Sequence, residues 1–265
     1  MESNILIVVE GVKTEAKFFK QLAKVFTQKF DIYCLGTNIY TLYKKLKEID
    51  FNGDLKDMLI EMHPDKKEML SKKFAYTYLV FDCDAHHPKK NDKRSLKDII
   101  INNFAALLEM ARYFVDETDP SIGKLYINYP MMESYKDCDD FFENKYSDTI
   151  VNIDNLSDYK KRVGKCKMCK IHINCYTKEN FSFLILQNIF KLNKITNQVW
   201  DKLGYEEYLK CSNNENILKN EIELVKENNI ISVLNTSLFM IADFFGNRDG
   251  FYDDLLKLVD KKQNM

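Results

Sequence analysis

Five carboxylates in this 265-residue sequence are candidates to share a metal ion. They lie just beyond apolar runs, or at the start of a predicted helix, and they are Glu10, Glu15, Asp82, Asp84 and Glu133. Carboxylates that gather within a few ångströms repel one another and raise each other's pKa. A hard divalent cation removes that cost, and ligation by oxygen alone is typical of Mg²⁺ or Mn²⁺. Such a site supports metal-assisted cleavage of a phosphodiester.

These carboxylates can meet only if the apolar runs are strands of one sheet. Five consecutive Ile, Leu and Val residues precede Glu10 without polar alternation, which indicates a strand buried on both faces. The β-branched and aromatic run at 76–81 precedes the Asp pair, and the run at 124–129 precedes Glu133. In a parallel sheet the carboxyl ends of the strands lie at one edge, and ligands bind beyond it. We therefore expect the acidic side chains to converge at that edge.

Strand and helix patterns alternate over the first half of the chain. The predicted strands cover residues 5–9, 31–35, 76–81 and 124–129, and the predicted helices cover 15–29, 39–49, 55–62 and 96–111. This alternation predicts an α/β fold with a parallel sheet flanked by helices. Beyond about residue 135 we predict helices only, at 176–192, 205–211, 214–228, 230–245 and 249–260. We expect an α/β domain over 1–135 and a helical region over 136–265 that packs on or beside it.

Composition and charge narrow the class of protein. The chain is 45% hydrophobic and 30% charged, which is typical of a globular protein, and no apolar run approaches the ~18 residues of a membrane span. The N-terminus lacks the features of a signal peptide, so we expect a cytoplasmic protein without a membrane partner. A net charge of −1 argues against a globally basic nucleic-acid binder but allows a basic groove. The seven unevenly spaced cysteines do not predict a disulfide framework.

A basic loop follows Asp84 directly. Its histidines and first lysines are His86, His87, Lys89 and Lys90. Loop histidines are more often solvated than functional, although one of these could bind a softer ion such as Mn²⁺ or donate to a phosphate. We expect the loop to lie over the carboxylates, which favours contact with a polyanionic substrate, so these four are candidate substrate-binding residues.

A second basic stretch contains Lys160, Lys161 and Lys165. It is either a solvated face or a patch that faces phosphate. Four soft metal ligands follow it at a uniform spacing of three, namely Cys166, Cys169, His172 and Cys175. Structural zinc sites usually combine a close pair of ligands with a second pair from farther along the chain, so this spacing favours thiols against the core over a zinc site.

The arrangement of acidic residues resembles a known family. Glu-Gly after a hydrophobic strand, followed by Asp-x-Asp after a later strand, resembles the Toprim domain of topoisomerases, primases and old-type nucleases (overcoming lysogenization defect). The closer resemblance is to the RloB-like branch found at bacterial phage-defence loci. It rests on Glu-Gly-Val-Lys-Thr-Glu at 10–15, the Phe pair at 18–19, and Pro-Met-Met-Glu-Ser-Tyr at 130–135. The resemblance covers residues 4–135 and implies a Toprim-like, Rossmann-like fold.

The resemblance also implies roles for the acidic residues. Glu10 would be the general acid and base, and Asp82 and Asp84 would bind the divalent metal. Glu10, Glu15 and Glu133 would complete or surround the metal shell.

Two departures from the family pattern concern Glu15 and Tyr135. Glu15 lies five positions after Glu10, whereas most old-type nucleases place the second acidic residue four positions on, and Tyr135 stands where tryptophan is expected. Such nucleases also use a late basic residue. Lys160 and Lys161 are the candidates for that catalytic role, with Lys165 as a third.

We therefore predict a nuclease that depends on Mg²⁺ or Mn²⁺ and cleaves DNA or RNA, such as tRNA. The resemblance implies a role in bacterial anti-phage defence, and it leaves open a regulatory partner protein such as an ATPase and a homo-oligomer. One alternative is a metal-dependent glycosyl or nucleotidyl transferase that uses Asp82 and Asp84, which gives Glu10 and Gly11 no role. Another is a non-catalytic Toprim-like scaffold that binds a partner protein.

Overall fold

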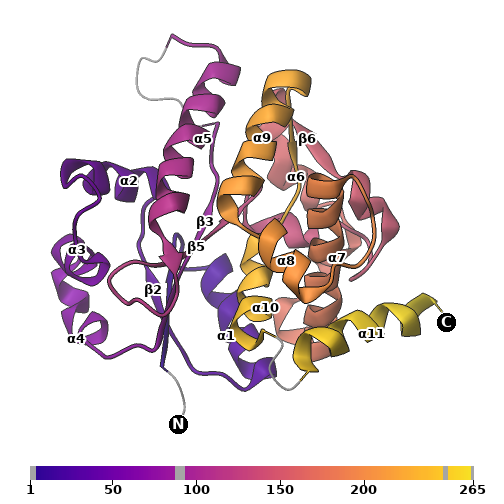
Figure 1. Ribbon diagram of the computed structural model, residues 1–265, viewed down its shortest axis with the longest axis horizontal. Coiled ribbons are helices and arrows are strands. Elements are labelled where there is room, and N and C mark those ends of the chain that lie inside the picture. Colours follow the sequence, from indigo (N-terminus) through magenta and orange to yellow (C-terminus); the bar gives the residue numbers. More distant parts are fainter. Residues whose placement is uncertain (1–3, 87–92, 247–249, 264–265) are drawn as a thin grey trace.

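The computed structural model describes residues 4–86, 93–246 and 250–263. A five-stranded sheet lies at the centre of the molecule (Figure 1). Its strands are β1 (Ile5–Val9), β2 (Phe30–Cys34), β3 (Tyr76–Asp82), β4 (Val115–Asp116) and β5 (Gly123–Asn128). They lie in the order β2-β1-β3-β5-β4, and all neighbours are parallel except β4, which is antiparallel to β5. The predicted α/β fold with a mostly parallel sheet is confirmed.

The path of the chain creates a switch in direction at β1. Every residue of β1 is buried because β2 and β3 flank it and helices cover both faces of the sheet. The chain runs from β1 outward to β2 and then returns past β1 to β3. The carboxyl ends of β1 and β3 therefore form a topological switch point, where open α/β sheets bind ligands. Glu10 follows β1 directly, and Asp82 is the last residue of β3.

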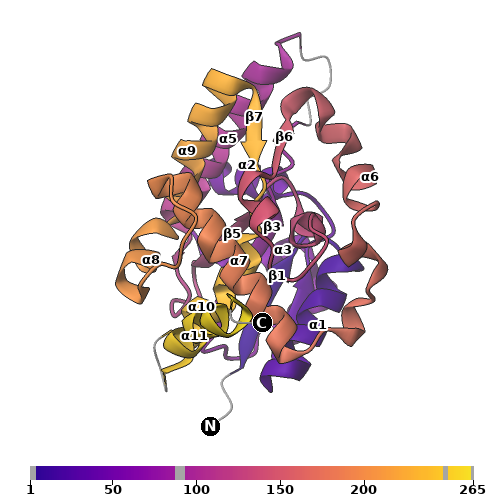
Figure 2. The ribbon, with the colours of Figure 1, turned by 90° about the vertical axis from the view of Figure 1, so that its right-hand side faces the viewer.

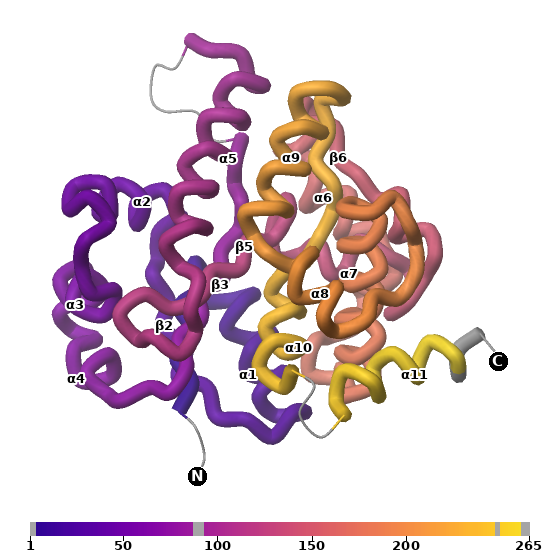
Figure 3. Tube along the Cα trace, in the orientation of Figure 1, coloured from indigo at the N-terminus to yellow at the C-terminus, as the bar shows by residue number. Residues whose placement is uncertain are grey.

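Helices cover both faces of this sheet. α1 (Thr14–Phe26) lies on one face, and α2 (Ile39–Glu48), α3 (Leu55–Met62), α4 (Lys67–Leu70) and α5 (Leu96–Tyr113) lie on the opposite side (Figure 1). The later helices are α6 (Tyr159–Val163), α7 (Lys178–Asn197), α8 (Tyr205–Cys211), α9 (Asn214–Asn228), α10 (Phe239–Phe245) and α11 (Phe251–Gln263). α7 and α10 join α1, and α9 runs beside α5 (Figure 3). Over the described ranges, no helix has the length and apolar character needed to cross a membrane.

The aromatic face of α1 connects the two halves of the chain. Phe18 packs against Tyr135 and Phe181, with ring centroids 5.0 and 5.4 Å apart. Phe26 packs against Phe181 and against Phe245 of α10. One buried cluster consequently extends from the sheet into the C-terminal helices. The boundary at residue 135 stays a prediction, and the region beyond it lies on the sheet as a layer.

Two predictions for the C-terminal half are wrong. β6 (Ile150–Asn152) and β7 (Ile230–Ser232) form an antiparallel pair where only helices were predicted (Figure 2). The predicted helix at 230–245 begins as β7, and α10 starts only at Phe239. The cause is local, because Asn229 adopts a positive φ of 55° that ends α9, and β-branched isoleucines then favour an extended strand.

Candidate functional site

A pocket of about 470 Å³ opens at the carboxyl edge of the sheet. All five predicted acidic residues line it, together with one predicted lysine, and they are Glu10, Glu15, Asp82, Asp84, Glu133 and Lys160. The loop at 10–15 supplies one wall, the end of β3 a second, and the segments around Met131 and α6 the remainder. The structure thus brings together the acidic residues that lie far apart in the sequence.

Glu10 lies directly after β1 in the wall of the pocket. Burial, together with the negative charges of Asp84 and Glu15, raises its pKa to about 8. One oxygen, Oε2, is buried without a hydrogen-bond partner among the described residues. Gly11 keeps the neighbouring wall open, because a Cβ at this position would lie 2.9 Å from Glu15 Oε2. The short loop after β1 therefore holds two carboxylates close together.

The loop after β3 is held rigidly by its backbone. Asp82 pairs in register with Asn128 of β5, and the Cys83 N–H donates to the Asn128 carbonyl at 3.0 Å. Asp84 has a φ of 38°, so the chain turns sharply after the strand. Burial raises the pKa of Asp82 well above its usual range, and the charge of Glu10 is the next largest cause. These shifts are the physical signature of acidic groups crowded in a poorly hydrated place.

Lys160 supplies a positive charge at this pocket. Its ammonium lies 2.5 Å from Glu133 Oε1, and this hydrogen bond raises the pKa of Lys160. Lys161 points elsewhere, since it pairs with Asp158 at 2.8 Å, has an 81% exposed side chain and does not line the pocket. Lys165 does not line it either. Of the predicted catalytic lysines, the structure brings only Lys160 to the carboxylates.

The predicted substrate-binding loop is described only in part. His86 is described, is half-buried and does not line the pocket. His87, Lys89 and Lys90 lie outside the described residues. The proposed role of this loop therefore stays a prediction.

The three cysteines of the segment 166–175 lie in different environments. Cys166 donates to Asp137 Oδ1 at 3.7 Å, Cys169 is half-buried, and Cys175 is exposed. Across the described ranges, no group of three or more His, Cys, Asp or Glu side chains is closed around a point that could hold a metal ion. This finding covers both the cysteine segment and the carboxylate pocket, whose acidic side chains are gathered but not closed around one centre.

The donor chemistry of the carboxylate pocket nevertheless fits a hard divalent cation. The donors are carboxylate oxygens, which Mg²⁺ and Mn²⁺ prefer. The buried Oε2 of Glu10 is without a partner among the described residues. The pKa values of Glu10 and Asp82 are raised by burial and then by neighbouring carboxylates, and a bound cation would offset both effects. Glu10, Asp82 and Asp84 are the residues that would hold it, with Glu15 and Glu133 beside them.

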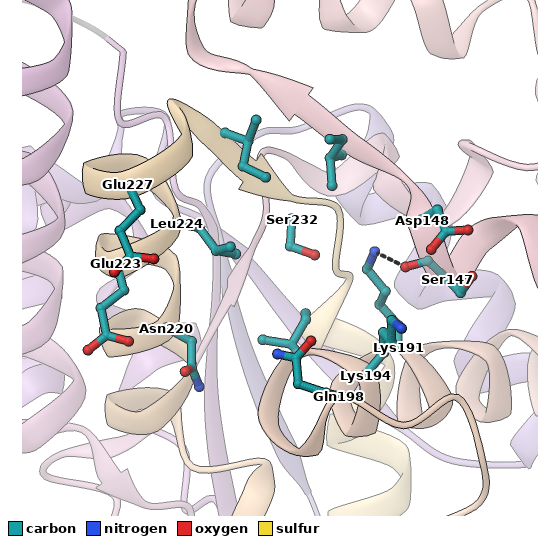
Figure 4. A pocket seen from close by; sticks show the side chains of 13 residues that line it. Ser147, Asp148, Lys191, Lys194, Gln198, Asn220, Glu223, Leu224, Glu227 and Ser232 are labelled. Atoms are coloured by element: carbon teal, nitrogen blue, oxygen red, sulfur yellow. Dashed lines mark hydrogen bonds between the residues drawn. The ribbon is translucent and has the colours of Figure 1, made fainter.

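A second hollow, of about 440 Å³, was not anticipated from the sequence (Figure 4). It lies between α7, α9 and the β6–β7 pair. The buried Lys191 donates to the carbonyls of Ser147 and Thr149 at 2.7 and 2.9 Å. Burial lowers the pKa of Lys191 to about 8. These hydrogen bonds attach α7 to the strand pair and give the lysine a structural role.

The sequence analysis did not identify Tyr40, which contacts the backbone between Asp82 and Asp84. Its hydroxyl donates to the carbonyl of Cys83 at 2.6 Å. The available signal was the position of Tyr40 in the first turn of a helix that Asn38 caps, just after a strand of the same sheet. Helices that begin there point their first turn toward the ligand edge.

Comparison of the chain with protein-family models, curated proteins and solved structures finds no match. The class that fold and site define is an α/β protein with an acidic pocket at the switch point of a mostly parallel sheet.

Proposed function

We propose that this protein is a divalent-metal-dependent nuclease that cleaves phosphodiester bonds at the carboxyl edge of its sheet. The observation that carries the proposal is the convergence of five carboxylates and Lys160 in one pocket at the switch point between β1 and β3. A nucleic acid presents phosphates, and an acidic pocket accepts them only when cations compensate the charge. The resemblance of residues 4–135 to Toprim nucleases supports the same reading.

Each residue has a definite part in this proposal. Glu10, Asp82 and Asp84 would hold the cation, which when bound would supply charge neutralisation at the phosphate and activation of water. Glu10 lies in the same pocket and would also serve as the general acid and base, as the resemblance implies. Lys160 leaves Glu133 and neutralises the phosphate at the mouth of the pocket.

This arrangement favours a nuclease over the alternative functions. A transferase that uses only Asp82 and Asp84 leaves the buried Glu10 without a role, although Glu10 shares their pocket. A non-catalytic scaffold gives no reason to bury Glu10 and Asp82 beside other carboxylates, an arrangement that raises the pKa of both groups. The substrate polymer, a role in bacterial anti-phage defence and a regulatory ATPase partner rest on the resemblance alone. A cytoplasmic location and homo-oligomer formation stay open.

The direct test is cleavage of plasmid, single-stranded DNA and total tRNA with Mg²⁺, with Mn²⁺ and with a chelator. We expect metal-dependent cleavage of at least one polymer by the wild type, and loss of cleavage in Glu10→Gln and Asp82→Asn. Glu68→Gln, an exposed glutamate on α4, is the matched control and should retain full activity.

A second readout does not need a substrate. Below pH 8 Glu10 must lose a proton to bind a cation, so Mn²⁺ binding should release protons and tighten as pH rises toward 8. Calorimetry in buffers of different ionisation enthalpy measures this release. A wild type that neither cleaves any polymer nor binds either metal would overturn the proposed function.

A further inference from the structure

A polar groove lies directly behind the Asp pair, on the opposite side of the sheet from α1. Its volume is about 500 Å³, which is ample for a nucleoside, and α2 and α5 form its walls. Tyr40 and Tyr43 line it from α2, and Asn102 and Asn103 line it from α5. Ala105 and Ala106 of α5 also line the groove, and their small side chains leave space in it. The groove is separate from the carboxylate pocket and shares none of its lining residues.

One residue connects the groove to the carboxylate pocket. Tyr40 lines the groove, and its hydroxyl donates to the carbonyl of Cys83, which lies between Asp82 and Asp84. Asn103 donates to the carbonyl of Ala85 at 2.8 Å, one residue beyond the pair. Both walls are thus hydrogen-bonded to the loop that carries the acidic side chains, so the groove begins within a residue or two of the proposed metal ligands.

The side chains of the groove match the chemistry of a nucleobase. The Tyr43 ring is fixed by an edge contact with Phe51, with centroids 6.2 Å apart, and by a hydrogen bond from its hydroxyl to Glu109 at 3.3 Å. A fixed aromatic ring provides a stacking platform. Asn102 is exposed, and its amide donates one hydrogen bond to the carbonyl of Asp98. Side-chain amides carry both donors and acceptors and so pair with base edges.

Positive charge at the rim suits the sugar–phosphate backbone. Lys44 and Arg94 line the groove and are both exposed. No ion pair between Lys44 and another described residue is present. Exposed cations beside a stacking surface are the usual combination in proteins that bind single-stranded nucleic acids.

We propose that this groove takes up one nucleobase of the substrate next to the cleaved phosphodiester, and that the substrate is therefore a single-stranded segment of DNA or RNA. The inference rests on the proposed nuclease function. A base within a duplex is stacked and paired, so it cannot enter the groove unless it leaves the helix. The groove thus specifies the strandedness of the substrate, whereas the carboxylate pocket specifies the bond that is cleaved.

The test measures binding of fluorescent oligonucleotides to the full-length Glu10→Gln variant in Mg²⁺, so that cleavage does not interfere. We expect a single strand to bind about tenfold more tightly than the duplex of the same sequence. Replacing one nucleotide by an abasic site, at successive positions, should weaken binding about tenfold at one position only. In Glu10→Gln combined with Tyr43→Leu, that abasic effect should disappear, whereas Tyr43→Phe should preserve it.

Two controls separate a binding effect from a folding effect. Thermal unfolding of each variant reports whether the fold is intact, and Asn102→Ala should reduce the abasic effect, whereas Asn216→Ala, an exposed asparagine on α9, should not. Equal binding of single strand and duplex, no binding of either, or an abasic effect that survives Tyr43→Leu would overturn the inference. In each of these cases the proposed nuclease function stands if Glu10→Gln still abolishes cleavage, and it fails if the wild type neither cleaves nor binds metal.

Discussion

The ionised carboxylates of Glu10 and Asp82 are unfavourable in the folded protein when no cation is bound. Both lie at the ends of central strands, where burial and neighbouring negative charges raise their pKa values. Near neutral pH the folded protein must keep protons on these groups or tolerate their repulsion. Such crowding is common where a site is built for a ligand that the chain itself does not supply.

The crowding predicts a stabilising substitution at Asp82. We expect Asp82→Asn to raise the free energy of unfolding by about 1 kcal/mol in a chelating buffer at pH 7, because it removes one charge from the cluster. The same variant should lose the increase in melting temperature that saturating Mg²⁺ or Mn²⁺ gives the wild type. Thermal unfolding with and without metal measures both effects.

Asp65→Asn is the control for this prediction, since Asp65 is exposed, pairs with Lys66 at 3.1 Å and does not line the pocket. It should change the free energy of unfolding by no more than about 0.5 kcal/mol. It should also keep the increase in melting temperature that metal gives the wild type. A destabilised Asp82→Asn that still responds to metal would show that Asp82 is not part of a repelling metal site.

At the scale of elements, the short helix α6 determines which lysine reaches the carboxylates. Tyr159 and Val163 bury one side of the helix. Arg162 pairs with the buried carboxylate of Asp137, donates to the carbonyl of Ile150 at 2.7 Å and lies 4.8 Å over the Tyr159 ring. These contacts orient the helix so that Lys160 faces Glu133.

Arg162 is therefore predicted to act as a positioning residue. Arg162→Ala should lower cleavage about tenfold, in the same direction as Lys160→Ala, because Lys160 loses its fixed position. It should also cost about 2 kcal/mol of stability, since Asp137 is left buried without its cation. Cleavage rates and urea unfolding measure the two effects.

The comparison with Lys160 isolates the positioning role. In the Lys160→Ala background, Arg162→Ala should reduce cleavage little further. Lys161→Ala, on the same helix but outside the pocket, should retain near wild-type cleavage. Additive losses in the double variant would contradict the proposed connection between Arg162 and Lys160.

The buried Glu221, which connects α9 to β7, predicts that the stability of the protein depends on pH. Glu221 is fully buried and accepts from the Ser232 N–H at 3.0 Å, and burial raises its pKa from 4.5 to about 8. Between these values the unfolded chain binds fewer protons than the folded one, so stability falls as pH rises from about 4.5 to 8. Glu221→Gln cannot titrate and can still accept the same hydrogen bond.

The stability of Glu221→Gln relative to wild type should therefore rise by roughly 2–4 kcal/mol between pH 5 and pH 8. Urea unfolding at the two pH values measures the difference. Glu223→Gln, an exposed position on the same helix, should show no such trend. A relative stability of Glu221→Gln that stays constant over this range would exclude Glu221 as the source of the pH dependence.

At the scale of the whole molecule, the sheet and the C-terminal helices share one core. The aromatic side chains of α1 are buried by Phe181 of α7, by Phe245 of α10 and by Phe251 of α11. Removing residues beyond 135 would expose that face of α1 to water. Because the burial of an aromatic side chain contributes a few kcal/mol, the first half would lose much of its margin of stability.

We expect a fragment of residues 1–135 to lack cooperative unfolding and native near-ultraviolet circular dichroism, whereas the full chain unfolds in one transition. Urea titration of both proteins, followed by circular dichroism and fluorescence, measures this difference. A fragment that unfolds cooperatively with a native spectrum would establish 1–135 as an independent domain.

The four parallel strands and the acidic residues that follow three of them were predictable from the sequence. Five aliphatic residues in succession without polar alternation indicate a strand buried on both faces, and a carboxylate that directly follows such a strand lies at the edge of the sheet. Local pattern therefore predicted the α/β fold and the convergence of Glu10 with Asp82 and Asp84.

The residues that complete the site depend on contacts between distant elements. Lys160 and Lys161 are equivalent in sequence, and the packing of α6 alone separates them. The strand β7 was predicted as helix because its pairing with β6 joins residues 78 to 82 positions apart, which no local period reveals. The groove behind Cys83 likewise forms from α2 and α5, so it exists only once the chain has folded. Periodicity reports which side of an element is buried, whereas contacts between elements depend on how their faces meet in space.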